Sequence, residues 1–237
     1  MRPCLLRPIR SCRRIQLRRI REAAWLRPRV RFESGGRPVV SSGVLFADYD
    51  ATGLPAGVFG VWPDSSGLGH DTGVHSGSPV AGVFDGLPGV DMTDESSGFQ
   101  VPDVAAGPLT IFAVGDQLDA SLGWQFFGGV VRVFQDSGAD LVAFSSSALD
   151  SGVVVPLGVY VVVAAVFAGA SSRVAVWPDG VVVNGDSGVM PDGSGPFLGS
   201  TDRPATGYLR EFLVYEGALS TGDVSSVVAW LRAKWSV

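Results

Sequence analysis

Two tryptophans have polar residues near them in the sequence, a combination of side chains suited to binding sugars. An indole ring offers a flat apolar face, and neighbouring carboxylates or amides accept hydrogen bonds from hydroxyl groups. The candidate ligand-binding residues are Trp62, Asp64, Trp177, Asp179 and Asn184. The alternative is that both tryptophans belong to the hydrophobic core, because their large apolar area favours burial.

Aspartates are concentrated in two further stretches, around residues 64–71 and 85–94. Calcium prefers hard oxygen ligands, so Asp64, Asp71, Asp85 and Asp91 are candidate calcium ligands if the two loops converge. The spacing of an EF-hand is absent, and the alternative is that these aspartates form turns. Calcium is therefore the one cofactor that the sequence suggests.

Catalytic chemistry finds little support in the sequence. A glycosidase needs two carboxyl groups that face each other across the substrate. Beyond residue 40 the only glutamates are Glu95, Glu211 and Glu216, and the last two would point to opposite faces of a strand. His70 and His75 lie in a loop rich in Gly, Ser and Asp, without a nucleophilic serine in a G-x-S-x-G elbow. These features predict no catalytic residues; a carboxylate pair built from loop aspartates is the alternative.

The elements that position these residues are predicted to be short strands joined by tight turns. The chain has 237 residues, 46% of them hydrophobic, with 32 glycines, 15 prolines and a single lysine. Turn-forming residues therefore dominate and helix-forming residues are scarce. Apolar strand candidates recur at residues 44–46, 58–62, 89–92, 109–114, 124–127, 130–134, 141–144, 159–167, 173–177, 181–183 and 208–215. This punctuation predicts an all-β fold, an antiparallel jelly-roll sandwich of two sheets.

One helix is predicted, at the C-terminus. Ser220 and Asp223 form a capping box, with Ser220 as the N-cap and a carboxylate three residues later. The apolar residues that follow share one helical stripe; they are Val224, Val227, Val228, Leu231 and Trp235. Such a stripe predicts that the helix covers part of the sandwich.

The N-terminal segment differs from the rest of the chain in charge. Residues 1–37 contain twelve arginines and two glutamates, whereas residues 38–237 contain six basic and twenty-one acidic residues. This asymmetry predicts a basic, partly helical or extended arm at residues 1–40 and the sandwich at residues 41–237. The residues expected to mediate its contacts are Arg13, Arg14, Arg18, Arg19, Trp25, Arg29 and Arg31. Phosphate binding, a membrane-surface helix and docking onto an acidic protein remain alternatives, of which docking is preferred.

Several motifs resemble those of concanavalin A-like (laminin-G-like) domains of bacterial and bacteriophage surface proteins. The loop WPDSSGLGHD at residues 62–71 resembles the family's W-x-D-x-S-G-x-G loop, and FDG at 84–86 resembles its F-D-G turn. The most specific match is GYLREFLVY at 207–215, followed by ALS at 218–220 and the closing helix. The resemblance covers about residues 44–237 and implies a two-sheet jelly roll that is often adhesive or carbohydrate-binding.

From this resemblance and the arm we expect a non-enzymatic virion structural protein, either a minor tail protein or a capsid decoration protein. The arm would bind other virion proteins, the protein would form a homo-oligomer or a multi-copy assembly, and the sandwich would contact host envelope glycans. No transmembrane segment and no nucleic-acid partner are expected. The location would be the tail or capsid surface of the virion, or otherwise extracellular or at the cell surface. The alternatives are a polysaccharide-cleaving enzyme on the same fold, a bacterial surface adhesin module and a purely structural spacer.

Overall fold

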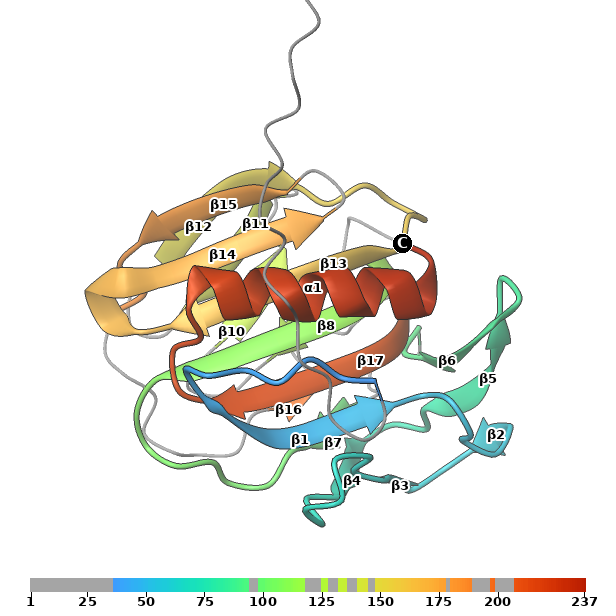
Figure 1. The fold of residues 1–237 in the computed structure, drawn as a ribbon. Helices are drawn as coiled ribbons and strands as arrows, with labels where there is room; N and C mark the ends of the chain where they lie inside the picture. Colours follow the sequence, from blue (N-terminus) through green and yellow to red (C-terminus); the bar gives the residue numbers. More distant parts are fainter. Residues whose placement is uncertain are drawn as a thin grey trace, which may run out of the picture. The chain divides into compact units, whose positions relative to one another are not determined.

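The computed structural model shows a two-layer antiparallel β-sandwich with a helix packed on its outer face (Figure 1). It describes residues 36–237 except for 94–97, 118–124, 128–131, 136–139, 145–147, 178–179, 189–196 and 199–206. The predicted fold class is confirmed. The predicted arm residues Arg13, Arg14, Arg18, Arg19, Trp25, Arg29 and Arg31 lie outside the described residues, as does Asp179.

The larger sheet has nine strands in the order β15-β14-β13-β8-β17-β6-β5-β2, with β1 also paired to β17. All of these pairs are antiparallel. The strand bounds are β1 Val44–Asp50, β2 Gly57–Val58, β5 Val80–Phe84, β6 Leu87–Asp91, β8 Leu109–Gln117, β13 Val161–Phe167, β14 Ser172–Trp177, β15 Val181–Gly185 and β17 Gly207–Glu216. A short 3-10 helix, Gly169–Ser171, joins β13 to β14.

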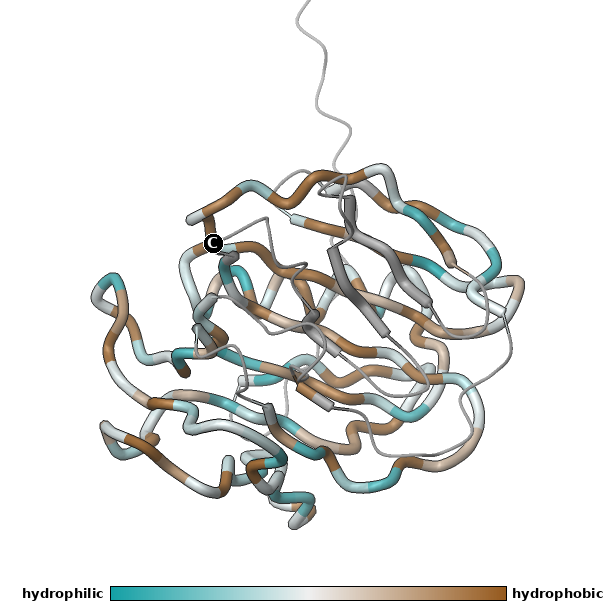
Figure 2. Tube along the Cα trace, turned by 180° about the vertical axis from the view of Figure 1, so that it is seen from behind, coloured by the Kyte–Doolittle hydropathy of each residue, from teal (hydrophilic) through white to brown (hydrophobic). Residues whose placement is uncertain are grey.

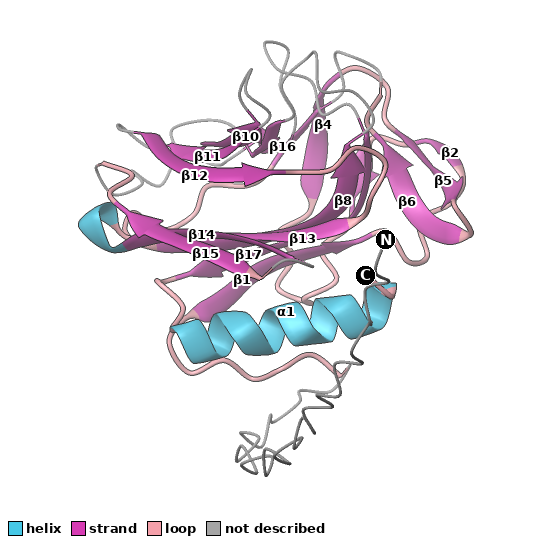
Figure 3. Ribbon diagram, turned by 90° about the horizontal axis from the view of Figure 1, so that it is seen from above, coloured by secondary structure: helices cyan, strands magenta, loops and turns pink. Residues whose placement is uncertain are grey.

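Two four-stranded antiparallel sheets form the second layer, one in the order β12-β11-β10-β9 and the other in the order β16-β7-β4-β3. Their bounds are β3 Val61–Trp62, β4 Thr72–Ser76, β7 Gly98–Gln100, β9 Gln125–Phe127, β10 Arg132–Gln135, β11 Asp140–Phe144, β12 Ala148–Val154 and β16 Phe197–Leu198. Figure 3 shows this layer on one side of the large sheet and the helix α1 on the other.

Alternation along the central strands gives the large sheet two buried faces. In β8, Ile111 and Ala113 point into the core between the layers, whereas Phe112 and Val114 point to the face covered by α1. The same alternation runs along β13, where all seven residues are buried. The colouring by hydropathy in Figure 2, a view from behind, shows that the central strands are largely hydrophobic. A strand buried on both faces explains the continuous apolar run in this part of the sequence.

The helix α1 spans Thr221–Trp235, as the capping box predicts. The Ser220 hydroxyl accepts a hydrogen bond from the Asp223 backbone N–H at 3.1 Å. The five residues of the predicted apolar stripe are all buried against the sheet. The Asp223 carboxylate also accepts hydrogen bonds from the backbone N–H groups of Ser41 and Ser42, at 3.2 and 3.0 Å, so it attaches the chain before β1 to the helix start.

A β-bulge in β17 changes the direction of two neighbouring charged residues. Leu209 pairs with Gly115 and Glu211 pairs with Val114, so Arg210 is the extra residue. Leu209 faces the core between the layers, whereas Glu211 contacts Trp235 of α1 on the outer face. The bulge thus places both charged side chains, Arg210 and Glu211, on the outer face of the large sheet.

Candidate functional site

Trp62 is a core residue and cannot serve as a sugar platform in this structure. Its side chain is 0% exposed and lies against Tyr49, Phe59 and Phe99, with ring centroids 5.5–6.3 Å apart. Its indole N–H donates to the backbone oxygen of Asp50 at 3.2 Å. This corrects the sequence-based assignment, because the face that would stack on a sugar is covered by other aromatic rings.

Asp64 organises its own loop. Its carboxylate accepts hydrogen bonds from the backbone N–H groups of Asp48, Ser66 and His70 at 3.0, 2.8 and 3.1 Å, and from the Ser66 hydroxyl at 2.6 Å. Burial acts to raise the pKa of Asp64, but these hydrogen bonds lower it overall. Because four donors already occupy its oxygens, Asp64 is a loop-forming residue rather than a ligand-binding one.

The four candidate calcium ligands do not form one site. Asp71 accepts a hydrogen bond from the Asp64 backbone N–H at 2.8 Å, whereas Asp85 and Asp91 belong to the β5–β6 hairpin. Among the described residues, no group of three or more His, Cys, Asp or Glu side chains could hold a metal ion. The expected convergence of the two aspartate-rich loops is therefore wrong. Asp64 and Asp71 accept hydrogen bonds from backbone groups of their own loop, whereas Asp85 and Asp91 lie on a hairpin of the large sheet.

Trp177 is half-buried beside α1, and its pairing with Asn184 is not observed. Together with Arg173 and Val182 it lines a shallow pocket between β14, β15 and the first turns of the helix. Asn184 is exposed, but it pairs with Arg173, four residues from Trp177 along the strand. This separation corresponds to about 13 Å. Of the predicted sugar-binding set, Trp177 alone remains in a suitable place among the described residues.

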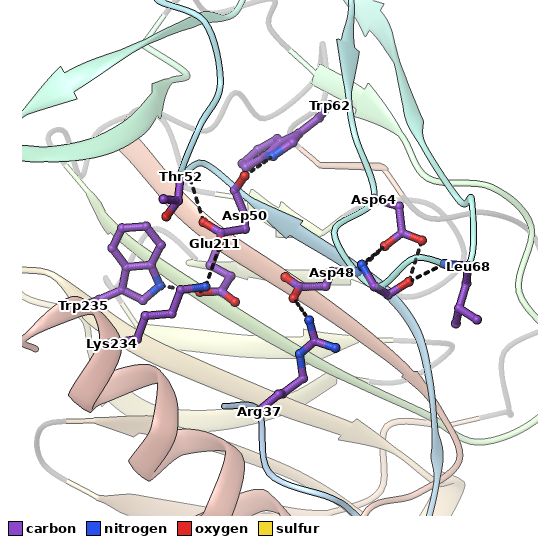
Figure 4. A network of polar contacts seen from close by, with 11 residues as sticks. Arg37, Asp48, Asp50, Thr52, Trp62, Asp64, Leu68, Glu211, Lys234 and Trp235 are labelled. Atoms are coloured by element: carbon purple, nitrogen blue, oxygen red, sulfur yellow. Dashed lines mark hydrogen bonds and ion pairs between the residues drawn. The ribbon is translucent and has the colours of Figure 1, made fainter. Parts of the chain in front are cut away.

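Carboxylates and cations gather in a buried ion cluster formed by Arg37, Asp48, Asp50, Glu211 and Lys234 (Figure 4). The Lys234 Nζ lies 2.7 Å from Asp50 Oδ2 and 2.8 Å from Glu211 Oε2, and Arg37 pairs with Asp48. Glu211 is 0% exposed and Asp48 is 1% exposed. A substrate cannot reach Glu211 or Asp48, and the ion pairs of Lys234 attach the end of α1 to the sheet.

We expect the stability of the fold to decrease as the pH rises from about 4.5 to about 8. Burial, followed by the charge of Asp48, raises the pKa of Glu211 to about 8. The folded state therefore keeps a proton that the unfolded chain releases, and it loses stability as this proton is removed. Glu211→Gln should reduce the pH dependence by more than about 1 kcal/mol, measured by urea unfolding at pH 5 and pH 9. Glu216→Gln is the control, and equal slopes for the two variants would contradict the assignment.

A second group of polar side chains lies on the outer face of the large sheet, where β8 and β17 meet the β5–β6 hairpin. Figure 1 shows this hairpin beyond the C-terminal end of α1. Val114 and Val162 pack beneath the helix, and Asp116 and Tyr160 follow at two-residue spacing on the same face. We call this group the tyrosine–aspartate cluster; its members are Phe84, Asp85, Asp91, Asp116, Tyr160, Tyr208 and Arg210.

Strand register brings the cluster together. Tyr208 of β17 pairs with Asp116 of β8 on one side and with Asp91 of β6 on the other. Tyr160 directly precedes Val161, whose partner Gly115 is the neighbour of Asp116. The Asp116 carboxylate accepts a hydrogen bond from the Tyr208 backbone N–H at 2.9 Å. The result is a transverse row of alternating tyrosines and aspartates across four adjacent chain segments.

The β5–β6 hairpin adds an aromatic ring and a carboxylate to this row. Asp85 and Gly86 form its two-residue turn with positive φ angles of 51° and 80°, as an Asp-Gly hairpin turn requires. The Phe84 ring stacks on Tyr208 with centroids 4.3 Å apart and planes 11° from parallel. The exposed Asp85 accepts a hydrogen bond from the Tyr160 hydroxyl at 3.2 Å.

Arg210 fixes the hairpin to the sheet. Its guanidinium donates to the backbone oxygens of Pro88 and Phe84 at 2.7 and 2.9 Å, and lies 3.8 Å from the centre of the Tyr160 ring. The residue is 0% exposed, and burial lowers its pKa. Hydrogen bonds from a charged donor are stronger than neutral ones, so Arg210 holds Tyr160 and the hairpin in fixed positions.

The cluster has the side chains that carbohydrate chemistry uses. Tyr160 and Tyr208 are half-buried rings at the surface, and Asp85 and Asp91 reach solvent beside them. Burial raises the pKa of Asp116, which lies almost fully buried beneath them. Glycosidases place carboxyl groups in different environments so that one stays protonated. The geometry therefore supports sugar stacking together with hydrogen bonding by carboxylates.

The sequence predicts Asp85 and Asp91 as metal ligands and does not indicate the rest of this cluster. One signal was present, because the pair Arg210-Glu211 interrupts the apolar run at residues 207–215. Charged residues in a central strand need buried partners. Their partners come from strands far apart in the sequence, so the cluster itself becomes visible only when the register is known.

The fold class defined by these features is an antiparallel β-sandwich with a polar, aromatic surface site. No family model matches the sequence, and no curated protein matches it. In the described part of the chain, no helix has the length and apolar character needed to cross a bilayer.

Solved structures of similar fold include domains of glycosidases. Domain 4 of an extracellular arabinanase from Geobacillus stearothermophilus, in complex with arabinotriose, matches with a TM-score of 0.61 and 19% identity over 79% of this chain and 100% of that domain. A Trypanosoma rangeli sialidase in complex with sialic acid matches with a TM-score of 0.62 and 15% identity, over 86% of this chain and 36% of that one. An α-L-arabinofuranosidase matches with a TM-score of 0.56 and 13% identity, over 74% and 51%. The chain thus spans only part of the sialidase and of the arabinofuranosidase, and these identities show a shared fold.

These neighbours contradict the expected function. A non-enzymatic virion structural protein was predicted from the resemblance and the arm, whereas the structurally similar chains are parts of glycosidases. No bacteriophage or virion protein is among the structures compared above. The same neighbours contradict the prediction that the protein is not an enzyme. The arginine-rich arm and the motifs of the fold do not distinguish a display domain from a domain of a glycosidase.

Proposed function

We propose that this chain acts in polysaccharide cleavage, with its β-sandwich supplying the surface that binds the glycan. The observation that carries the proposal is the tyrosine–aspartate cluster, in which two aromatic rings and two solvent-accessible carboxylates share one face of the sheet. The proposal is also supported by the similarity of the sandwich to domain 4 of the arabinanase, since that domain is in complex with arabinotriose. We also propose that the chain belongs to the concanavalin A-like family. In this proposal residues 1–40 form an arm and residues 41–237 form the sandwich.

The rigid position of the rings favours binding over a purely structural role. Tyr208 is supported from one side by Phe84, and Tyr160 is supported by Arg210. A sugar that binds to preorganised rings loses less free energy to side-chain ordering. Asp91 is the strand partner of Tyr208, and Asp85 directly follows Phe84, whose ring stacks on Tyr208, so both carboxylates are placed to accept hydrogen bonds from hydroxyl groups of a sugar on this ring.

Arabinotriose is the first probe, titrated calorimetrically into the full-length protein. Tyr208→Ala should weaken binding at least tenfold because it removes a stacking face, a change that corresponds to about 1.4 kcal/mol. Tyr208→Phe keeps the ring and should bind as the native protein does. Loss of binding in Trp177→Ala, with Tyr208→Ala unaffected, would instead place the sugar in the pocket beside α1.

Cleavage is tested separately with neutral plant and bacterial polysaccharides. Release of reducing ends by the full-length protein, absent from a heat-denatured sample, is the expected result. Absence of both oligosaccharide binding and reducing-end release across these substrates would overturn the proposed function.

A further inference from the structure

The exposed charges of the tyrosine–aspartate cluster are all negative. Asp85 is exposed at the hairpin turn and Asp91 is half-buried beside Tyr208. Asp116 is 2% exposed and is the strand partner of Tyr208. Burial, followed by the charges of Asp91, Asp116 and Asp85, raises the pKa of Tyr208, in agreement with the position of these carboxylates around the ring. An anionic group placed at this ring would therefore meet charges of its own sign.

Arg210, the cation of the cluster, cannot pair with the negative charge of an anionic ligand. A sugar carboxylate is bound best by two parallel N–H donors of an accessible guanidinium. Arg210 is 0% exposed, donates to the backbone oxygens of Pro88 and Phe84, and is covered by the ring of Tyr160. Its Nη1 and Nη2 donate to the hairpin, and its Nε is buried without a hydrogen-bond partner among the described residues, so exposing the guanidinium would require the hairpin to open.

Charges outside the cluster act in the same direction. Residues 38–237 contain twenty-one acidic and only six basic residues. Three cations of the described residues have partners outside the tyrosine–aspartate cluster. Arg37 and Lys234 are paired in the buried ion cluster, and Arg173 donates to Thr221 at 2.7 Å. The field of residues 38–237 therefore disfavours the approach of an anion, and the whole chain keeps a net charge of −5.

We infer that the tyrosine–aspartate cluster selects uncharged sugars and rejects sugars that carry a carboxylate. The inference rests on the proposed function, because it concerns the same surface. It separates this chain from any binder of sialic or uronic acids, despite the similarity of fold to a sialidase. Hydroxyl groups of a neutral sugar can donate to Asp85 and Asp91, whereas a carboxylate has no proton to donate at neutral pH.

The test uses two probes that differ in charge and little in shape, a galacturonic acid trimer and its methyl ester, with arabinotriose as a third probe. At 20 mM salt the full-length protein should bind the ester at least tenfold more tightly than the acid. The difference should narrow at 500 mM salt, because salt screens repulsion between exposed charges.

Asp85→Asn tests the origin of the selectivity. The turn position has φ 51°, which asparagine adopts readily, so the hairpin should be retained. The ratio of ester to acid affinity should fall severalfold in this variant. Asp150→Asn makes the same change of charge at an exposed position of β12 and should leave the ratio unchanged.

The outcomes separate the two proposals. If none of the three probes binds, the proposed function fails for these sugars and the selectivity fails with it. If the acid binds as tightly as its ester, or if Asp85→Asn alters the ratio no more than Asp150→Asn, glycan binding stands and the inferred charge selectivity is overturned.

Discussion

Replacing Lys234 with methionine is expected to destabilise the protein by about 3 kcal/mol. The side chain contacts two carboxylates, Asp50 at 2.7 Å and Glu211 at 2.8 Å, and Glu211 is fully buried. Removing the cation leaves these groups without their partner in a region that water barely reaches, which costs more than the ion pair itself contributes. The end of α1 would then separate from the sheet. Urea unfolding at pH 9, above the pKa of about 8 of Glu211, measures the loss with this carboxylate ionised.

A double variant identifies the cause of this loss. Glu211→Gln removes the buried negative charge, so combining it with Lys234→Met should restore part of the lost stability. The control is Arg232→Met, on the same helix, where the side chain donates to the backbone oxygen of Val237 at 2.9 Å. A loss below about 1 kcal/mol for Lys234→Met, or no recovery in the double variant, would contradict a buried charge pair.

Replacing Arg210 with methionine is expected to release the β5–β6 hairpin and to abolish glycan binding. The substitution removes two charge-assisted hydrogen bonds, to Pro88 and Phe84, and the contact with the Tyr160 ring. Hydrogen bonds from charged groups contribute about 1.5–3 kcal/mol each, so a loss of about 3 kcal/mol is expected. Faster amide hydrogen exchange in residues 80–91 would show that the effect is local to the hairpin.

Arg173→Met provides a matched comparison. Arg173 also donates to a backbone oxygen, that of Leu219, and to the Thr221 hydroxyl, but it does so at the start of α1. Its loss should affect the helix start and leave the hairpin and glycan binding intact. If Arg210→Met and Arg173→Met have the same effect on residues 80–91, Arg210 does not hold the hairpin.

The sequence predicts those features that depend on local chemistry. The helix α1 follows from the Ser220–Asp223 capping box and one apolar stripe, and the hairpin turn follows from the Asp-Gly pair at 85–86. The sandwich follows from frequent turn residues between apolar segments. In each case a few neighbouring residues determine the backbone conformation, so tertiary context changes little.

The candidate site depends instead on tertiary context. Trp62 and Asp64 have the residue types of a binding site, but the fold buries the first and uses the second to form a loop. Conversely, Tyr160 and Tyr208 appear unremarkable in the sequence and become neighbours of Asp116 through strand pairing. A bulge at Arg210 adds a change of direction that the alternation of a regular strand does not predict.

The position of β17 also determines when the molecule can fold during synthesis. This strand occupies residues 207–216, yet it pairs with β1, β6 and β8, which all come from the first half of the chain. Until residue 216 is available, those earlier strands lack their common partner and expose unpaired edges. Pairings of such large sequence separation form slowly, so the nascent chain remains vulnerable to aggregation until β17 is made.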